Sequence, residues 1–462
     1  MSGIPLATGQ DQLPVQIVAT PSTSRVVAAG WYDALATHLI LFPTLVFAIH
    51  FIIIQAIGSL ALRYGSVSTT YESSKARVGY QLPGHESISA LILPFMRWDG
   101  IWFGYSARYS STFRLGSSME QFGDAGDALW PLLSWVMRDG SRLTGIQPEV
   151  MGFAFVNICL AGALIALYNL MLIDFDIAIV RRALWCLVLF PTSFFFHALY
   201  PEAVFLFFVA VCLLACKRSH WVIAGVLGLL ASLTRSQGVL LIVPMVIIFI
   251  DQMRIRPRRH LLSSLFLFLP LLGPAMRLRG LNRSGITWQI ELRTQRMQLR
   301  DHEPIWSTFD CAIRGCSRNI ILVSNRFSQF NPGVRWQWAI DAINHPSWKL
   351  VTSPGWRREA AMSGALGLIV TVGCLLLAGV GLFRLPLWMN SYVVTMLLLA
   401  LIRTPALDPF DHMPRFALLL FPLAIVLATL LNDRLTRIIL GSLSAVMLVL
   451  LTMQFVNWYW VA

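Results

Sequence analysis

The sequence predicts an all-α, polytopic integral membrane protein with about eleven transmembrane helices, and three observations lead to this fold class. Of the 462 residues, 56% are hydrophobic and only 13% are charged, whereas an ordinary soluble domain carries roughly 25% charged residues. The mean hydropathy is +0.65. The apolar residues also gather in long runs, and a spanning helix needs about 20 of them. These features exclude a disordered chain, a coiled coil and most soluble enzymes.

Each predicted span is an apolar run bounded by a polar or charged break, and the boundaries are soft by several residues. The spans cover residues 35–62, 151–173, 182–197, 201–216, 220–234, 238–251, 261–275, 361–382, 386–402, 416–431 and 438–457.

The spans divide the chain into a few regions. These are a polar tail at 1–34, an N-terminal transmembrane module at 35–275 whose first outer loop is 63–150, a long loop at 276–360, and a C-terminal transmembrane module at 361–462.

Loop charges predict the orientation. When the tail is placed inside, every short inside loop carries Lys or Arg, as at Arg181 and Arg182, whereas the outside loop 197–201 carries neither. This is the positive-inside pattern. It makes the tail cytoplasmic and both long loops extracytoplasmic. The net charge of +13 is then loop charge that sets topology, and we expect no nucleic-acid partner.

The first outer loop contains a candidate catalytic carboxylate. Asp99 follows Arg97 and Trp98 and is bracketed by the local breakers Pro94 and Gly100. A carboxylate near the membrane surface can act as a general base toward an alcohol. The alternative is that Asp99 and Arg97 form a surface ion pair that only anchors the loop.

A second polar cluster lies at a helix–helix junction. His197, Tyr200 and Glu202 stand within six positions, and Pro201 is suited to start a helix. Glu202 would then lie in the first helical turn, where the helix dipole favours a carboxylate. That is a sufficient structural explanation for Glu202, and a ligand-binding role is the alternative.

Two arginines at predicted outer helix ends complete the set. Arg235 follows an apolar helix, where it either reaches lipid headgroups or binds a lipid phosphate in a fork. Arg415 follows His412 and Pro414 and lies in the first turn of a predicted helix, where the dipole disfavours a cation. A cation placed against its dipole indicates an anion nearby.

These motifs together resemble the GPI mannosyltransferase 2 (PIG-V-type) family, in order and spacing, over roughly residues 90 to 430. The matching segments are Arg97-Trp98-Asp99-Gly100, Phe190-Pro191-Thr192-Ser193-Phe194-Phe195-Phe196, Tyr200-x-Glu202, Leu233-Thr234-Arg235-x-x-Gly238 and Pro414-Arg415-Phe416.

The resemblance implies a membrane-embedded glycosyltransferase of the C class, with its site on the extracytoplasmic face. It implies a polyprenyl-phosphate sugar donor, typically dolichyl-phosphate mannose, and an inverting transfer in which Asp99 is the catalytic base. The residues that it assigns to donor-phosphate or sugar binding are Arg97, Trp98, Tyr200, Glu202, Arg235, His412 and Arg415.

The expected partners are the polyprenyl-phosphate donor, a glycolipid or other membrane-associated acceptor, and membrane lipid. No cofactor and no metal are expected, because guanidinium groups can neutralise a leaving phosphate; Asp408 and Asp411 keep a metal site open as an alternative. A transferase of another lipid-linked sugar, or a flippase for a polyprenyl-linked glycan, is the competing function. The membrane would be the plasma membrane in a bacterium and the endoplasmic reticulum in a eukaryote.

Overall fold

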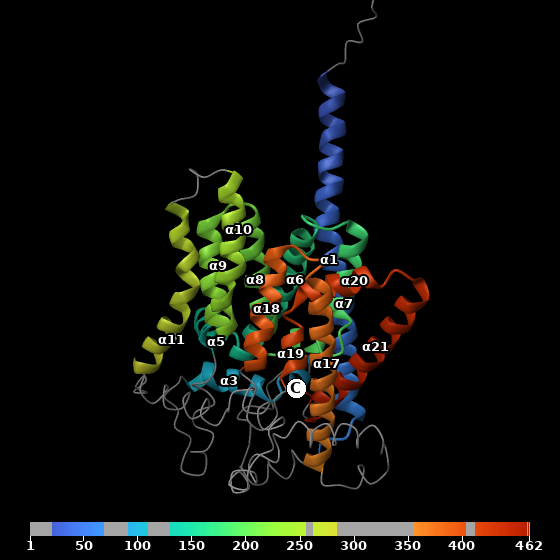
Figure 1. The fold of residues 1–462 in the computed structure, drawn as a ribbon. Coiled ribbons are helices and arrows are strands. Elements are labelled where there is room, and N and C mark those ends of the chain that lie inside the picture. Colours follow the sequence, from blue (N-terminus) through green and yellow to red (C-terminus); the bar gives the residue numbers. More distant parts are fainter. Residues whose placement is uncertain are drawn as a thin grey trace, which may run out of the picture. The chain divides into compact units, whose positions relative to one another are not determined.

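The computed structural model describes residues 21–68, 91–109, 130–255, 262–283, 355–402, 412–459 and 461. The chain forms two compact units, Met1–Phe42 and Pro43–Ala462, and the candidate site lies in the second. The described residues form α-helices and short 3-10 helices and no strand (Figure 1). The all-α part of the predicted fold class is therefore confirmed for the described residues.

Four helical segments are long and apolar enough to cross a membrane. They are His38–Tyr64 within α1 (Pro21–Tyr64), α6 (Pro148–Met171), Ser236–Arg254 within η4 (Ser236–Leu241) and α10 (Ile242–Ile255), and α21 (Arg434–Val456). Many of their large apolar side chains are exposed, and Ile52, Ile158 and Leu435 are each more than 60% exposed. Whole apolar faces of this kind suit contact with lipid. The structure is consistent with a membrane protein.

Every predicted span falls on a helix, but most of the helices are short. Apolar helices of 10–17 residues cover Trp221–Thr234, Leu265–Arg277, Leu366–Gly381, Leu387–Leu401 and Phe421–Leu430. The count of eleven spans therefore stays a prediction.

Several predicted boundaries differ from the helix ends in the structure. The span predicted at 182–197 ends early, because α7 (Ile177–Val188) stops ahead of Pro191 and the chain continues through turns into η3 (Ser193–Phe196). Proline disfavours helical backbone at the residue before it and lacks the N–H that a helix needs. The tail predicted at 1–34 is helical from Pro21 onward.

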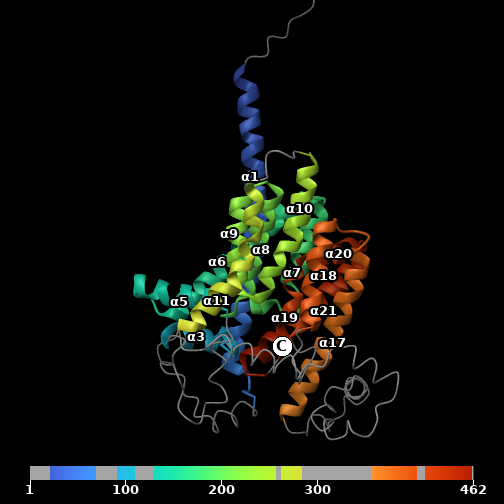
Figure 2. The same cartoon turned by 60° about the vertical axis from the view of Figure 1, so that its left-hand side comes forward.

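The helices of the second unit pack as two neighbouring groups. In the first group, α6 lies on α8 (Glu202–Lys217), α8 on α9 (Trp221–Thr234), and α9 on η5 (Leu262–Leu271), which leads into α11 (Leu272–Arg283). The second group joins α17 (Gly355–Gly381), α18 (Leu387–Ile402) and α20 (Phe421–Leu430). Contacts between α10 and α18 connect the groups (Figure 2).

Shorter helices occupy one end of the bundle. They are η2 (Leu93–Phe95), α3 (Asp99–Tyr109), α5 (Pro131–Thr144) and α19 (Met413–Ala417), and α3, α5 and α19 lie toward the lower end in Figures 1 and 2. A bidentate ion pair between Arg108 and the buried Glu149 ties α3 to the start of α6. The first outer loop predicted at 63–150 therefore contains at least two helices.

The second predicted loop is only partly described. Its first residues, 276–283, belong to α11, so the boundary predicted after residue 275 falls inside a helix. The range 284–354 lies outside the described residues.

Candidate functional site

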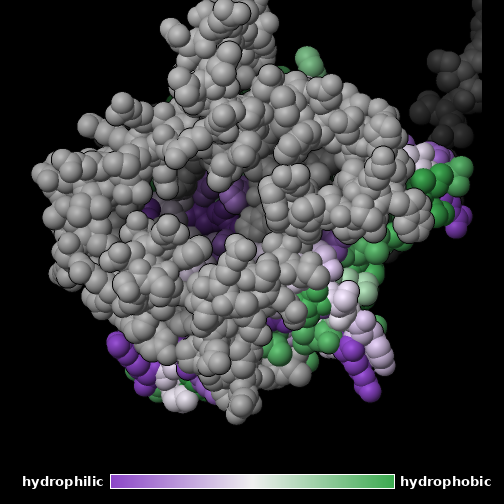
Figure 3. Space-filling view, turned by 90° about the horizontal axis from the view of Figure 1, so that it is seen from below, coloured by the Kyte–Doolittle hydropathy of each residue, from purple (hydrophilic) through white to green (hydrophobic). Residues whose placement is uncertain are grey.

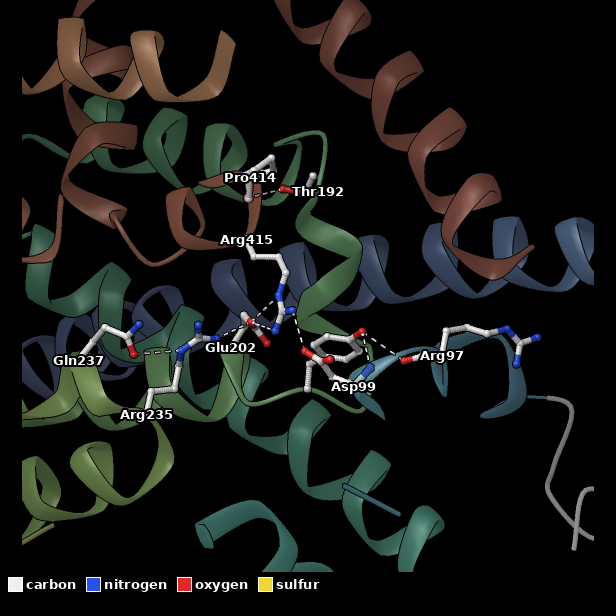
Figure 4. A network of polar contacts seen from close by, with 9 residues as sticks. Arg97, Asp99, Thr192, Glu202, Arg235, Gln237, Pro414 and Arg415 are labelled. Carbon is white, nitrogen blue, oxygen red and sulfur yellow. Dashed lines mark hydrogen bonds and ion pairs between the residues drawn. The ribbon is translucent and has the colours of Figure 1, made fainter. Parts of the chain in front are cut away.

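Four charged side chains from distant parts of the chain meet in one hydrogen-bonded cluster (Figure 4). The Arg415 guanidinium is at its centre. Its Nη1 donates to Asp99 Oδ2 at 2.8 Å, and its Nε and Nη2 donate to Glu202 Oε1 at 3.0 and 2.9 Å. The same Glu202 oxygen accepts a hydrogen bond from Arg235 Nη1. The structure thus brings together a carboxylate that the sequence placed in the first outer loop and three charged groups that it placed at separate helix ends.

Arg415 is held in position from several sides. It lies in α19, a helix of only five residues, and the preceding Pro414 carbonyl accepts a hydrogen bond from Thr192 Oγ1 at 2.8 Å. Its guanidinium carbon lies 4.6 Å from the centre of the Tyr200 ring and 5.3 Å from that of Phe195. These contacts hold the Arg415 guanidinium at the centre of the cluster and fix the directions in which its N–H groups donate.

Neighbouring carboxylates keep Arg415 charged. Burial by itself lowers the pKa of the Arg415 guanidinium, but the adjacent carboxylates of Glu202 and Asp99 raise that pKa above its usual value. The anion expected beside Arg415 is therefore present. The dipole argument for it does not hold, because Arg415 lies in the last turn of the five-residue α19 and not in the first turn of a longer helix.

Glu202 is the buried anion of the cluster. It begins α8 after Pro201, as predicted, and its side chain is fully buried. One oxygen, Oε1, accepts from both arginines, while the other, Oε2, has no hydrogen-bond partner among the described residues. Its position between two guanidinium groups gives Glu202 a role beyond a favourable helix dipole.

Arg235 leaves α9 in extended backbone and turns into η4. The turn needs glycine at position 238, because a Cβ there would lie 2.3 Å from the Ser232 backbone nitrogen. Arg235 Nε donates to Gln237 Oε1 at 3.3 Å, and the guanidinium lies 5.2 Å from the centre of the Phe416 ring. With Nε and Nη1 engaged, Nη2 is the part of Arg235 that can meet an anion.

Asp99 is the carboxylate that a substrate can reach. It begins α3, and its side chain is 38% exposed, against 0% for Glu202. Its backbone N–H donates to the Tyr200 hydroxyl at 3.1 Å, and that hydroxyl donates to the Arg97 carbonyl at 3.2 Å. Burial and the nearby Asp99 carboxylate raise the pKa of Tyr200 well above its usual value, so the phenol stays protonated and can donate.

Arg97 and Trp98 lie beside the cluster, and the Arg97 guanidinium points away from it. Its Nε donates to the Val456 carbonyl at 2.8 Å and its Nη1 to the Leu93 carbonyl at 2.7 Å. Asp99 forms its ion pair with Arg415. The alternative interpretation of the sequence had paired Asp99 with Arg97. Figure 4 shows Arg97 and Arg415 on opposite sides of Asp99.

His412 directly precedes α19. Burial, and after it the charge of Arg415, lower the pKa of His412 to about 4. The imidazole is therefore neutral at physiological pH. Asp408 and Asp411, which kept a metal site open, lie outside the described residues. The described residues contain no group of three or more His, Cys, Asp or Glu side chains that could hold a metal ion.

A buried polar chain lies behind the cluster, and the sequence singled out only one of its members, His197. His197 Nδ1 lies 2.6 Å from Asn157 Oδ1, and its Nε2 lies 2.9 Å from His50 Nδ1. His50 Nε2 in turn lies 3.0 Å from Ser193 Oγ. The chain fixes the segment between α7 and α8 that carries Phe195 and Tyr200. The available signal was the polar side chains inside apolar helices, His50 in α1 and Asn157 in α6.

Figure 3 views the molecule from below and shows hydrophilic residues inside a hollow near the centre, and both apolar and hydrophilic residues at the edge. Comparison with known proteins identified no matching family model, no matching characterised protein and no matching solved structure.

Proposed function

We propose that this chain is an inverting glycosyltransferase that moves mannose from a polyprenyl-phosphate donor to a membrane-associated acceptor on the extracytoplasmic face. The observation that carries the proposal is the cluster of Asp99, Glu202, Arg235 and Arg415. It combines one accessible carboxylate with two guanidinium groups on a chain that has membrane-protein character. The same four residues belong to the motifs that resemble the GPI mannosyltransferase 2 family.

Asp99 is the general base in this mechanism. As the acceptor hydroxyl oxygen attacks the anomeric carbon of the sugar, its proton moves to the Asp99 carboxylate. The bond between that carbon and the phosphate oxygen breaks, and the polyprenyl phosphate leaves with the electron pair. One displacement on the face opposite the leaving group inverts the configuration.

The charges of the cluster suit this proton transfer. In the resting site, the two guanidinium groups balance the carboxylates of Asp99 and Glu202. When Asp99 accepts the proton, its negative charge is lost and Arg415 Nη1 loses its ionic partner. The leaving phosphate gains one negative charge in the same step. Arg415 can then stabilise the phosphate together with Arg235 Nη2, for which the described residues show no hydrogen bond. Fixed donors aimed at developing charge lower the barrier.

The buried groups keep the arginines in place during this change. Glu202 holds one donor of Arg235 and two of Arg415. Because Glu202 is fully buried, we assign it to positioning the arginines and not to proton transfer. Tyr200 fixes the backbone of Asp99, and we assign neutral His412 to positioning the sugar or the phosphate.

The proposal includes the full topology inferred from the sequence. About eleven spans and a cytoplasmic tail place the cluster on the extracytoplasmic side, where a lipid-linked donor is available and cytoplasmic nucleotide sugars are not.

The test uses the purified chain in lipid nanodiscs, supplied with radiolabelled polyprenyl-phosphate mannose and a lipid extract from the membrane of its source. Chromatography of the products should show label in a new lipid or protein species that forms only with active chain. The competing flippase predicts movement of labelled donor across a vesicle bilayer with no new covalent product. That result would replace the proposed function.

A further inference from the structure

The C-terminal end of α21 and the residues after it contact the backbone that precedes Asp99. The carbonyl of Val456, the last residue of α21, accepts the hydrogen bond from Arg97 Nε at 2.8 Å. The Trp458 ring lies 4.7 Å from the Arg97 guanidinium carbon and meets the Trp98 ring edge-on, with the ring centres 5.8 Å apart. Both residues that directly precede Asp99 are therefore in contact with Trp458.

The end of α21 also contacts Tyr200, whose hydroxyl is the hydrogen-bond partner of the Asp99 backbone N–H. Phe455 packs against Phe195 and Tyr200, with ring centres 5.2 and 6.0 Å apart. The Tyr200 hydroxyl accepts from the Asp99 N–H. The last turn of α21 and the residues after it thus contact Asp99's neighbours in the chain and its hydrogen-bond partner in space.

The backbone conformation at Trp458 is one that favours glycine. Trp458 N–H donates to the Phe455 carbonyl and Tyr459 N–H to the Gln454 carbonyl, and Trp458 has φ +66°. This is the glycine-favouring left-handed position that ends many helices. A tryptophan is disfavoured there, so its presence requires a compensating contact of the side chain. The contacts of the Trp458 side chain include those with Arg97 and Trp98.

Trp98 likewise combines a positive φ with a ring contact to another tryptophan. Its φ is +50°, and the described residues contain only one further non-glycine residue with positive φ, the exposed Ser219. Residues held in sparsely populated backbone regions gather at functional sites, where the surrounding structure holds them. Trp98 and Trp458 hold each other, and Trp98 sets the direction in which α3 and Asp99 begin.

We propose that Trp458 is a positioning residue for Asp99, assisted by the Val456 carbonyl and the Phe455 ring. Trp458 fixes Arg97 and Trp98, and thereby the distance between Asp99 and Arg415. This inference rests on the proposed function for the catalytic meaning of Asp99. The segment lies outside the residues that carry the family resemblance.

The kinetic test compares three purified variants. Trp458→Leu fills much of the same space but removes the ring that faces Arg97, whereas Trp458→Phe keeps a ring. Trp221→Leu is the matched control, because Trp221 is also buried but lies at the start of α9 against Phe249. Misplacement of a catalytic group by about an ångström can lower a rate about 100-fold.

We therefore expect Trp458→Leu to lower kcat by about 10- to 100-fold with little change in donor KM. Trp458→Phe should restore most of the rate, and Trp221→Leu should lose thermal stability while it keeps kcat per folded molecule. Equal kcat values for Trp458→Leu and Trp221→Leu would overturn the positioning role.

A second readout does not depend on catalysis. The thiol introduced by Asp99→Cys is alkylated with a membrane-impermeant reagent, with and without Trp458→Leu, and background labelling is subtracted using the parent chain. A several-fold change in the alkylation rate supports the positioning role, and an unchanged rate contradicts it. If the wild-type chain transfers no sugar, the proposed function fails while this labelling result still decides the role of Trp458.

Discussion

Replacing Asp99 by asparagine separates the catalytic role of this residue from its structural one. Asn is nearly isosteric and keeps an oxygen that can accept from Arg415 Nη1, which lies 2.8 Å away in the wild type. It cannot take up the acceptor proton. Because the Asp99 side chain is 38% exposed, losing its ion pair should lower the stability by no more than about 1 kcal/mol. Arg415 stays anchored by its two hydrogen bonds to Glu202.

The effect on catalysis should be much larger. General base catalysis contributes about 10²- to 10⁴-fold, so we expect at least a 100-fold loss of transfer, with protein level and donor binding little changed. Asp99→Glu should recover little activity, because one added methylene displaces the carboxylate by about an ångström, which can cost about 100-fold.

The assay is the initial rate of mannose transfer by purified protein in nanodiscs. Asp139→Asn is the matched control, since Asp139 forms an Arg–carboxylate pair with Arg138 on α5, away from the cluster. It should leave the rate unchanged. An Asp99→Asn variant with more than about a tenth of the wild-type rate would refute the assignment of Asp99 as base.

Three further predictions concern phosphate binding, pH and topology. Arg235→Lys keeps the charge but loses the planar fork, so it should keep part of the transfer activity and Arg235→Ala almost none; near-wild-type rates for both would leave Arg235 a lipid-contacting residue. The pKa of His412 falls from 6.5 to about 4 on folding, so the unfolded chain binds more protons between these values and stability should decrease as pH falls through this range. In His412→Gln, the melting temperature should fall less over this range, and an identical fall would contradict the shift. A cysteine at Ser284 should react with an impermeant thiol reagent added outside and one at Arg258 should not, although both positions lie outside the described residues; the reverse pattern would overturn the orientation.

The sequence was sufficient to locate the charged cluster. Charged side chains at the ends of apolar helices are costly unless they are paired. Glu202, Arg235 and Arg415 were selected for this reason, or because of their expected position relative to a helix dipole. The structure shows the pairing partners, which no spacing along the chain could give. Glu202 and Arg415 are 213 positions apart.

The role of Arg97 shows where adjacency in sequence fails. Arg97 and Asp99 are two positions apart and were assigned to one ligand site. The left-handed backbone of Trp98 between them turns the chain, and the two side chains diverge. The sequence gives no sign of the positive φ at Trp98, because tryptophan does not favour this backbone conformation. In the structure Trp98 packs against Trp458.

Tertiary packing also explains the other differences. The contact between His50 and His197 joins residues 147 positions apart, and nothing in the sequence around His197 indicates His50 as its partner. The helical content was predictable from apolar runs, but helix length was not. The early end of α7 depends on Pro191, and the shortness of α19 and α20 depends on turns that the apolar pattern does not show.

The configuration of the transferred sugar shows whether Asp99 promotes a single displacement at the anomeric carbon. Purified chain in nanodiscs is given polyprenyl-phosphate mannose labelled with ¹³C at the anomeric carbon, together with the acceptor fraction, and the product linkage is determined by NMR. A single displacement with Asp99 as base predicts a new glycosidic bond whose anomeric configuration is opposite to that of the donor, formed by the wild type and not by Asp99→Asn. Retention of configuration, or a product that forms equally without the Asp99 carboxylate, would contradict the account.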